Sequence, residues 1–534
     1  MTAPPLPAAE PFYFGPAERP LFGWYHGTAS ARGPGVVLCS ALGLDGTRGY
    51  WSYRHLAERL SAAGMAVLRF DWHGTGDSSG DDRDPDRVAT WLADLDLAIE
   101  ELKRRSGTTR PALVGLRAGA TLAAQVAAGR HDISAVVLWI PALTGAAWVA
   151  EMAKLHKLYL RIVPQAGAPE PGGEEMLGSF AADQTIAALA KIDLMTLVRR
   201  PAPRMLVMDD GPLRGGDQLR EKLVGLGAEV EWTRHSGQKF LLMVPHRATL
   251  PDGSINLIVT WLGTVPADET IESSAPPSTA FTERPVRFGG DPEVFGIMVP
   301  PAPGARVTRP AVLLLNAGCV NRTGPHRLYV TMARRLAALG FPVLRVDLAG
   351  IGDTPASPNT PENLVYPRDG LAEIGLALDF LQAETGTDRF VVVGLCSGAD
   401  LAFQAARRGR RLEGVVMMNP RTFLELDLGR VESPTAQSAA SDDAAIAEAL
   451  RVTAGLGEIS RRGTDALLVV SRPDPGIDFV DRHAAGAMRE AEELPCFRRI
   501  DVPGTDHTFT TLASQRRVLD VVTDQLLAHD RAAD

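Results

Sequence analysis

The chain has 534 residues, of which 45% are hydrophobic and 22% charged, as is usual in a globular protein. Its formal net charge of −9 argues against a nucleic-acid-binding surface, and its four cysteines are too few for a disulfide framework. No apolar run approaches the ~18 residues of a membrane span. Because the N-terminus also lacks the basic and apolar regions of a secretory signal, we expect a cytoplasmic protein.

The first half of the chain alternates short apolar strands with helices. Because the strands are apolar throughout, we expect a mostly parallel sheet covered on both faces. Residues 143–197 interrupt the alternation and predict a cap insertion. The predicted strands are 12–14, 21–25, 36–39, 66–71, 112–115, 134–140, 205–208 and 229–233, and the predicted helices are 55–63, 87–102, 118–128 and 255–262.

The second half of the chain repeats the first. Residues 57–77 align with 333–353 without a gap, at an offset of 276, and strand 36–38 aligns with 312–314 at the same offset. Several segments at successive landmarks are unlikely to match by chance, so the repeat predicts two copies of one domain in tandem. Two further matches extend the repeat at slightly different offsets, Phe22-Gly23 with Phe295-Gly296 and 115–120 with 394–399.

The boundary between the copies is visible in the composition. Residues 264–280 are rich in Pro, Ser, Thr and acids, which predicts a linker between domains at 1–263 and 281–534. The second copy has a shorter predicted insertion, 421–463, with an Ala-rich helix over 444–454. The elements predicted after it are strands 466–470 and 497–502 and a final helix 518–527.

A β-branched run in the second copy ends in Gly394-Leu395-Cys396-Ser397-Gly398, and a helix-like segment follows. The two glycines lack a Cβ, so strand and helix can approach closely. Cys396 would then project at a helix N-terminus, where a thiolate is favoured. The alternative is a cysteine packed under a Gly-rich turn, because free cysteine is among the most buried residue types.

This stretch resembles the nucleophile elbow of the α/β-hydrolases, with cysteine in place of the commoner serine. The resemblance narrows to bacterial hydrolases associated with exosortase and with polysaccharide or secondary-metabolite clusters. The cysteine is also similar to that of dienelactone hydrolases and of the thioesterase and acyl-CoA N-acyltransferase branch. The resemblance to the α/β-hydrolases implies two tandem α/β-hydrolase domains, each a mostly parallel sheet flanked by helices with a small cap insertion. The motifs that carry it are 68–71 with 115–120, and 394–399 with 474–478.

The family places its acid and base after later strands, in the chain order nucleophile, acid, base. Asp474 follows the penultimate predicted strand and His507 follows the last one. The resemblance therefore implies a Cys396–Asp474–His507 triad. Asp478 is a rival for the acid, and Asp474 could instead be a turn residue beside proline.

Acyl transfer also needs N–H donors for the oxyanion of its intermediate. Ser397 lies off-centre between the glycines and is expected to offer its backbone N–H. The second donor should come from the loop after the early strand of this copy, from Gly318 or Cys319. Further along that loop, Arg322 or His326 could meet an anionic part of a substrate, or belong to a solvated charged loop.

The first copy lacks these residues. Arg117 stands at the centre of its elbow, and the positions of Asp474 and His507 fall near Pro212 and on Phe240. We interpret this copy as a degenerate hydrolase domain, in which Arg117 pairs with a neighbouring acid rather than binding an anion. The neighbouring Asp209 and Asp210 leave the alignment of the acid position open, whereas His235 and His246 lie nearby but are displaced.

Together these residues predict that Cys396 forms a thioester with an acyl ester or thioester substrate, which CoA or a carrier protein could deliver. Water, or an acceptor amine or alcohol, then releases the acyl group. No cofactor or metal is expected, because the sequence shows neither a complete dinucleotide fingerprint nor a metal-ligand spacing. The alternative is a non-catalytic binding or scaffold protein built from two degenerate hydrolase domains.

Overall fold

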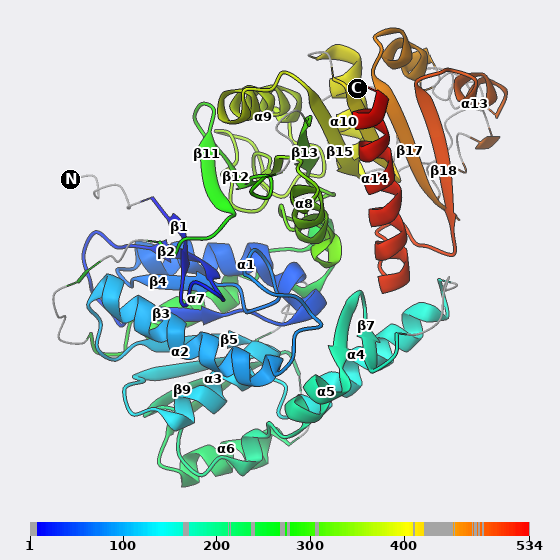
Figure 1. The fold of residues 1–534 in the computed structure, drawn as a ribbon. Coiled ribbons are helices and arrows are strands. Elements are labelled where there is room, and N and C mark those ends of the chain that lie inside the picture. Colours follow the sequence, from blue (N-terminus) through cyan, green and yellow to red (C-terminus); the bar gives the residue numbers. More distant parts are fainter. Residues whose placement is uncertain are drawn as a thin grey trace. The chain divides into compact units, whose positions relative to one another are not determined.

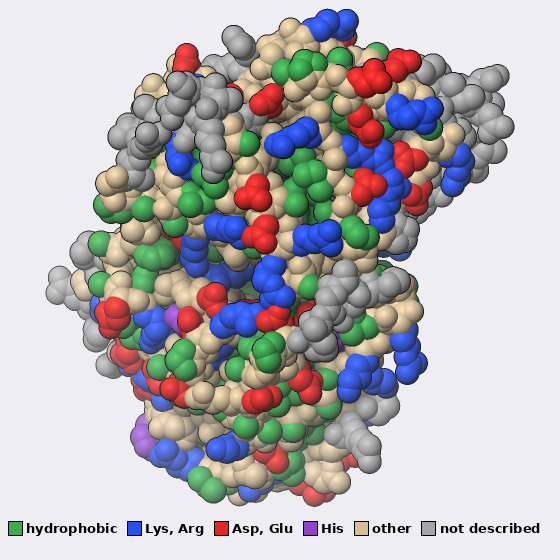
Figure 2. Space-filling model, turned by 45° about the vertical axis from the view of Figure 1, so that its right-hand side comes forward, with side chains coloured by type: hydrophobic (Ala, Val, Ile, Leu, Met, Phe, Trp, Pro, Cys, Tyr) green, Lys and Arg blue, Asp and Glu red, His purple; other side chains and the backbone are tan. Residues whose placement is uncertain are grey.

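A computed structural model describes most of the chain in two compact units, Met1–Tyr159 with Pro169–Phe281, and Leu160–Ala168 with Thr282–Asp534. Figure 1 shows the strands of each unit gathered into a sheet with helices packed against it. On the face drawn in Figure 2, acidic and basic side chains are interspersed. The described residues are 8–163, 170–211, 213, 215–235, 241–267, 273–274, 278–304, 309–409, 412–420, 452, 454–472, 474, 478, 481–482 and 485–532.

The first unit contains an eight-stranded sheet in the order β1-β2-β4-β3-β5-β6-β9-β10. The β1–β2 and β2–β4 pairs are antiparallel and the remaining pairs are parallel, which confirms the predicted mostly parallel sheet. The strands are β1 (Glu10–Phe14), β2 (Leu21–His26), β3 (Val36–Cys39), β4 (Val67–Phe70), β5 (Ala112–Leu116), β6 (Ala135–Trp139), β9 (Arg204–Asp209) and β10 (Glu229–Arg234).

Helices cover both faces of this sheet, because successive residues of a buried strand point to opposite sides. In β3, Val37 and Cys39 belong to one apolar cluster and Val36 and Leu38 to the other. The helices of the first cluster are α2 (Arg87–Ser106), α3 (Ala118–Gly129) and α6 (Gly216–Gly225), and those of the second are α1 (Gly43–Ala62) and α7 (Asp252–Leu262).

The predicted cap insertion is confirmed between β6 and β9. Residues 164–169 lie outside its described part. It consists of α4 (Gly145–Leu160), the hairpin β7 (Gly173–Met176) and β8 (Ser179–Ala182), α5 (Asp183–Ala190) and the short η1 (Leu194–Thr196).

The second unit repeats this plan with the sheet order β11-β12-β14-β13-β15-β16-β17-β18. Helices α9 and α10 pack on one face, and α8 and α14 lie on the other (Figure 1). The strands are β11 (Arg284–Phe288), β12 (Val294–Val299), β13 (Ala311–Leu315), β14 (Val343–Asp347), β15 (Phe390–Leu395), β16 (Gly414–Met418), β17 (Asp465–Arg472) and β18 (Phe497–Pro503). The helices are η4 (Pro325–Arg327), α8 (Leu328–Ala338), α9 (Gly370–Thr385), α10 (Ser397–Arg408), α13 (Ala485–Glu492) and α14 (Leu512–Ala532).

The strand registers confirm the repeat. Val36 lies opposite Val67 as Val312 lies opposite Val343, and Cys39 lies opposite Gly115 as Leu315 lies opposite Gly394. Most of the predicted second insertion, 421–463, and of its helix, 444–454, lies outside the described residues.

One stretch of equal length folds differently in the two units. α1 begins at Gly43, well before the predicted helix 55–63, whereas α8 begins only at Leu328, which is equivalent to Ser52. In the second unit His326 and Arg327 both have positive φ, which interrupts a right-handed helix. The residues before α8 therefore form a loop beside the elbow.

The end of the predicted linker packs on the first unit. Thr279 N–H donates to the Tyr13 carbonyl oxygen at 2.7 Å, and Ser278 Oγ accepts from Tyr13 N–H at 2.9 Å. These bonds extend the edge of the sheet at β1. Residues 268–272 and 275–277 of the predicted linker lie outside the described residues.

Candidate active site

The two elbows have nearly the same backbone conformation. Cys396 has φ 59° and ψ −124°, and Arg117 has φ 54° and ψ −124°. A non-glycine residue with positive φ is strained and persists only where the surrounding structure enforces it. Here the glycines enforce it: a Cβ on Gly394 would lie 2.0 Å from the Gly398 carbonyl oxygen, and one on Gly398 would lie 2.5 Å from that of Asn316.

Cys396 is the accessible member of the cysteines near the sheet. Its side chain is half-buried at the start of α10, whereas Cys39 and Cys319 are buried. Burial raises the pKa of the Cys39 thiol and, together with the charge of Cys396, raises that of Cys319 to about 12. Cys39 and Cys319 therefore remain thiols at neutral pH, and the placement of Cys396 is not that of a core cysteine.

The structure brings Asp474 to His507. His507 Nδ1 lies 2.7 Å from Asp474 Oδ2, and the Asp474 side chain is almost completely buried. Cys396 lies close enough to the same imidazole to raise its pKa. Asp478, the rival acid, instead lies 3.1 Å from Arg472 Nη1. Asp474 and His507 thus form a hydrogen-bonded pair near Cys396, and the three residues follow the chain order expected of a triad.

The partners of His507 determine its protonation. Burial by itself would lower the pKa of the imidazole, but hydrogen bonds to Asp474 and Cys396 and the negative charges of both groups raise it to about 10. With Cys396 as a thiolate, His507 is therefore an imidazolium at neutral pH. An imidazolium beside a thiol favours the thiolate, which is the nucleophilic form of cysteine.

A polar network holds the loop that carries His507. Asn419 Nδ2 donates to the His507 carbonyl oxygen at 2.8 Å, and Ser471 Oγ donates to that of Asp506 at 2.8 Å. Asn419 follows β16 and Ser471 lies in β17, so the sheet itself positions the imidazole.

The predicted oxyanion donors are distinguished by one contact. Gly318 N–H donates to Ser397 Oγ at 3.0 Å, so this amide is already used. Within the described part of the chain, the backbone N–H groups of Ser397 and Cys319 make no hydrogen bond. Ser397 is the first residue of α10, where N–H groups have no acceptor within the helix. Ser397 and Cys319 are therefore the better-placed pair.

Arg322 is not at the mouth of the site. Its side chain is fully buried, and Nη1 lies 2.7 Å from both Asp347 Oδ2 and Asp353 Oδ2. Its predicted role as a substrate contact is wrong for this geometry, because the guanidinium is neutralised inside the unit. His326, the other candidate, is half-buried in the turn before α8.

In the first unit, Arg117 pairs with acids as predicted. Its Nε lies 3.1 Å from Asp45 Oδ2 of α1, and its Nη2 lies 2.6 Å from Glu151 Oε2 of the cap helix α4. His235 contacts Ser254, with 3.2 Å between Nδ1 and Oγ. The aligned positions Pro212 and Phe240 lie outside the described residues.

Two polar groups near the elbow were not predicted. Asn316 stands at the start of the loop that carries the predicted oxyanion donors, where its side chain reaches Asp347. Asp400, fully buried in the first turn of α10, accepts a hydrogen bond from the Tyr366 hydroxyl at 2.7 Å. Asp400 was visible in the sequence as a carboxylate directly before the apolar run 401–403.

Comparisons with known proteins agree with the fold. Residues 46–208 match the family model of serine aminopeptidase, S33, and residues 304–458 match that of the dienelactone hydrolase family. Both are α/β-hydrolase families. With the two identical sheet orders, the matches show that the chain carries two α/β-hydrolase domains in tandem.

Similar solved structures each cover about half of this chain. A dienelactone hydrolase from Anabaena variabilis is 18% identical, with a TM-score of 0.32, over 46% of this chain and 97% of its own. A proline iminopeptidase from Mycobacterium smegmatis is 17% identical, with a TM-score of 0.31, over 47% and 100%. An alpha-beta serine hydrolase homologue from Coxiella burnetii is 12% identical, with a TM-score of 0.33, over 47% and 100%. No curated protein matched the chain.

The described residues contain neither a candidate metal-binding cluster nor a candidate membrane-spanning helix. No group of three His, Cys, Asp or Glu side chains among them is placed to hold a metal ion. None of the helices in the same part of the chain combines the length and the apolar character that crossing a membrane requires.

Proposed function

We propose that the second unit transfers an acyl group through a thioester on Cys396. The observation that carries this proposal is the hydrogen-bonded pair of His507 and the buried Asp474 near Cys396, with the cysteine on a strained elbow. The matches to two α/β-hydrolase families support a hydrolase. The cysteine and its imidazolium support the finer assignment.

The reaction follows from the placement of these groups. The Cys396 thiolate attacks the carbonyl carbon, an S–C bond forms, and the carbonyl π electrons move to oxygen. The N–H groups of Ser397 and Cys319 stabilise that oxyanion. When it collapses, the bond to the leaving group breaks, and His507 gives its proton to the departing oxygen or sulfur. The acyl group is then held as a thioester, while Asp474 keeps the imidazole oriented.

The second half of the reaction regenerates the thiolate. His507, now neutral, takes a proton from water or from an acceptor amine or alcohol, which attacks the thioester. Sulfur is a better leaving group than an alkoxide, so amine and thiol acceptors can compete with water. We therefore propose an ester or thioester substrate, carried by CoA or a carrier protein, in a bacterial biosynthetic pathway. The chemistry belongs to the second unit, because Arg117 occupies the place of the nucleophile in the first.

A substrate screen tests this function. Acyl thioesters, aryl esters and lactones are incubated with the wild type, Cys396→Ala and Cys496→Ala, and release of thiol, phenol or hydroxy acid is followed. We expect the wild type and Cys496→Ala to turn over at least one class, and Cys396→Ala to match buffer alone. Full activity in Cys396→Ala would contradict the proposal.

The competing function is a non-catalytic binding or scaffold protein. It predicts that iodoacetamide labels Cys396 no faster than Cys496, which is also half-buried. The imidazolium beside Cys396 favours the opposite result, because only a thiolate is alkylated rapidly.

A further inference from the structure

The oxyanion loop of the second unit, residues 316–322, is closed at both ends by one carboxylate. Asp347 Oδ1 accepts a hydrogen bond from Asn316 Nδ2 at 3.2 Å and another from the Arg322 backbone N–H at 2.6 Å. Asn316 Nδ2 also donates to the Val320 carbonyl oxygen at 3.0 Å. The first and last residues of the loop are thus held by the same oxygen atom.

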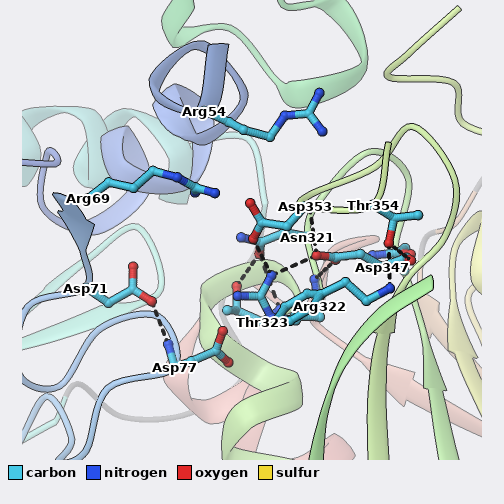
Figure 3. A network of polar contacts seen from close by, with 12 residues as sticks. Arg54, Arg69, Asp71, Asp77, Asn321, Arg322, Thr323, Asp347, Asp353 and Thr354 are labelled. Carbon is cyan, nitrogen blue, oxygen red and sulfur yellow. Dashed lines mark hydrogen bonds and ion pairs between the residues drawn. The ribbon is translucent and has the colours of Figure 1, made fainter. Parts of the chain in front are cut away.

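Arg322 makes this closure electrostatically possible. Asp347 and Asp353 are both buried, and two buried carboxylates would repel each other without a cation. The guanidinium of Arg322 lies between them, as Figure 3 shows, and stacks over the Phe295 ring at 4.5 Å. Asp347 Oδ2 also accepts from Asp353 N–H at 3.0 Å. The carboxylate of Asp347 therefore accepts hydrogen bonds at both oxygens.

The tip of the loop is fixed to the elbow. Gly318 N–H donates to Ser397 Oγ at 3.0 Å, and Gly318 has a φ of 58° that glycine adopts without strain. This contact sets Cys319, the next residue, beside the helix start that carries Cys396. The position of the Cys319 N–H therefore depends on contacts at three points of the loop.

The first unit shows which contacts the fold itself needs. Its turn after β4 is the same as the turn after β14: Ser78 Oγ donates to the Asp71 carbonyl oxygen and Thr354 Oγ1 to that of Asp347, both at 2.5 Å. Asp77 N–H also donates to Asp71 Oδ2 at 2.9 Å, as in the second unit (Figure 3). These contacts persist in the unit without a nucleophile, so they serve the fold.

The three loop contacts do not persist there. The residues equivalent to Asn316, Arg322 and Ser397 are Ser40, Gly46 and Ala118. Helix α1 runs through the stretch that forms the loop in the second unit. The unit that lost its nucleophile has thus lost all three groups and kept the aspartate.

We propose that Asp347, acting through Asn316 and Arg322, is a positioning residue that holds the Cys319 N–H at the developing oxyanion. This inference rests on the proposed acyl transfer and deepens it. Asp347, Asn316 and Arg322 touch no substrate, and their effect is confined to steps in which negative charge develops on oxygen. Loss of a single oxyanion donor lowers rates by about 10²–10³-fold.

Two probes of Cys396 separate this role from a structural one. Iodoacetamide alkylates the thiolate and forms no oxyanion, whereas an alkylthio trifluoromethyl ketone accepts the thiolate at carbon and places negative charge on oxygen. The variants are Asn316→Ala, which leaves the Arg322–Asp347 pair in place, and Ser397→Ala, with Ser397→Thr to restore the hydroxyl. Ser40→Ala, at the equivalent position in the first unit, is the matched control.

We expect Asn316→Ala and Ser397→Ala to bind the ketone about 10²-fold more weakly, with alkylation of Cys396 unchanged and with ketone affinity regained in Ser397→Thr. Ser40→Ala should behave as the wild type. Wild-type ketone affinity in Asn316→Ala overturns the inference, and so does a parallel loss with both probes, which indicates general disorder of the site. A wild type that does not add the ketone at Cys396 contradicts the proposed function itself.

Discussion

Replacing His507 with alanine is expected to lower kcat/KM about 10⁴-fold or more on any substrate that acylates Cys396. The variant loses the imidazolium that favours the thiolate and the proton donor for the leaving group. Steady-state kinetics on a substrate found by the screen measure the loss. A His507→Ala variant within tenfold of the wild type would exclude this residue as the base.

The contribution of His507 to the stability of the folded protein should decrease as pH rises. The folded protein raises the pKa of this imidazole from 6.5 to about 10, so the protonated form is the one that is stabilised. The contribution to stability is complete below about pH 6.5 and is lost as pH rises through about 10. The difference in melting temperature between wild type and His507→Ala should narrow over the same range.

The rate at which iodoacetamide alkylates Cys396 is a second test of the interaction between Cys396 and His507. Iodoacetamide reacts with a thiolate far faster than with a thiol, so an imidazolium partner that favours the thiolate raises the alkylation rate. We expect wild-type Cys396 to be alkylated much faster than in His507→Ala at pH 7, and the two rates to converge near pH 10. Equal rates at pH 7 would show that His507 does not activate the cysteine.

Replacing Asp474 with alanine is expected to lower kcat about 10³–10⁴-fold. The carboxylate is buried and holds His507 Nδ1 at 2.7 Å, so its removal frees the imidazole to rotate and weakens the stabilisation of its charge. The pKa of His507 should fall, which NMR titration of the imidazole measures directly. Binding of substrate should change little, because Asp474 is buried behind the histidine.

Asp478→Ala is the matched control for this variant. Asp478 lies four residues further along the chain and was the rival acid, but it pairs with the partly exposed Arg472. Because exposed ion pairs contribute little to stability, this variant should keep nearly full activity. If Asp478→Ala were the inactive variant and Asp474→Ala the active one, the assignment of the acid would be reversed.

The elbow could be predicted from sequence because its geometry depends on neighbouring residues. Gly394 and Gly398 are required by contacts between one strand and the helix that follows it. The repeat then predicted the same conformation at Arg117, although that residue has no nucleophilic role. The sheet followed from the alternation of strands and helices, because its strands are apolar throughout and such strands form a sheet covered on both faces.

The environment of Arg322 could not be predicted in this way. Its partner Asp347 ends β14, Asp353 follows that strand, and Phe295 precedes the loop by many residues, so the burial of Arg322 depends on tertiary contacts. An arginine in a polar, Gly- and Pro-containing stretch reads as a surface residue. The aligned stretch of the first unit, which forms α1, offered no guide because it folds differently.

The ion-pair partners of Arg117 could be predicted from sequence only in part. A neighbouring acid was predicted, and Asp45 lies on the helix beside the elbow. The second partner, Glu151, belongs to the cap insertion, whose docking onto the sheet no local pattern specifies. Burying an unpaired cation costs free energy, so it was predictable that Arg117 would pair with an acid. Which acids it pairs with required the structure.

Mass spectrometry of the trapped intermediate tests the central claim most directly. The wild type is mixed with an octanoyl thioester of N-acetylcysteamine, quenched in acid within the first turnovers, digested and mapped. Acyl transfer through Cys396 predicts an octanoyl adduct on the peptide that contains Cys396, absent in Cys396→Ala and present in Asp478→Ala. Turnover of this thioester with the acyl group found only on another residue, or undiminished in Cys396→Ala, would contradict it.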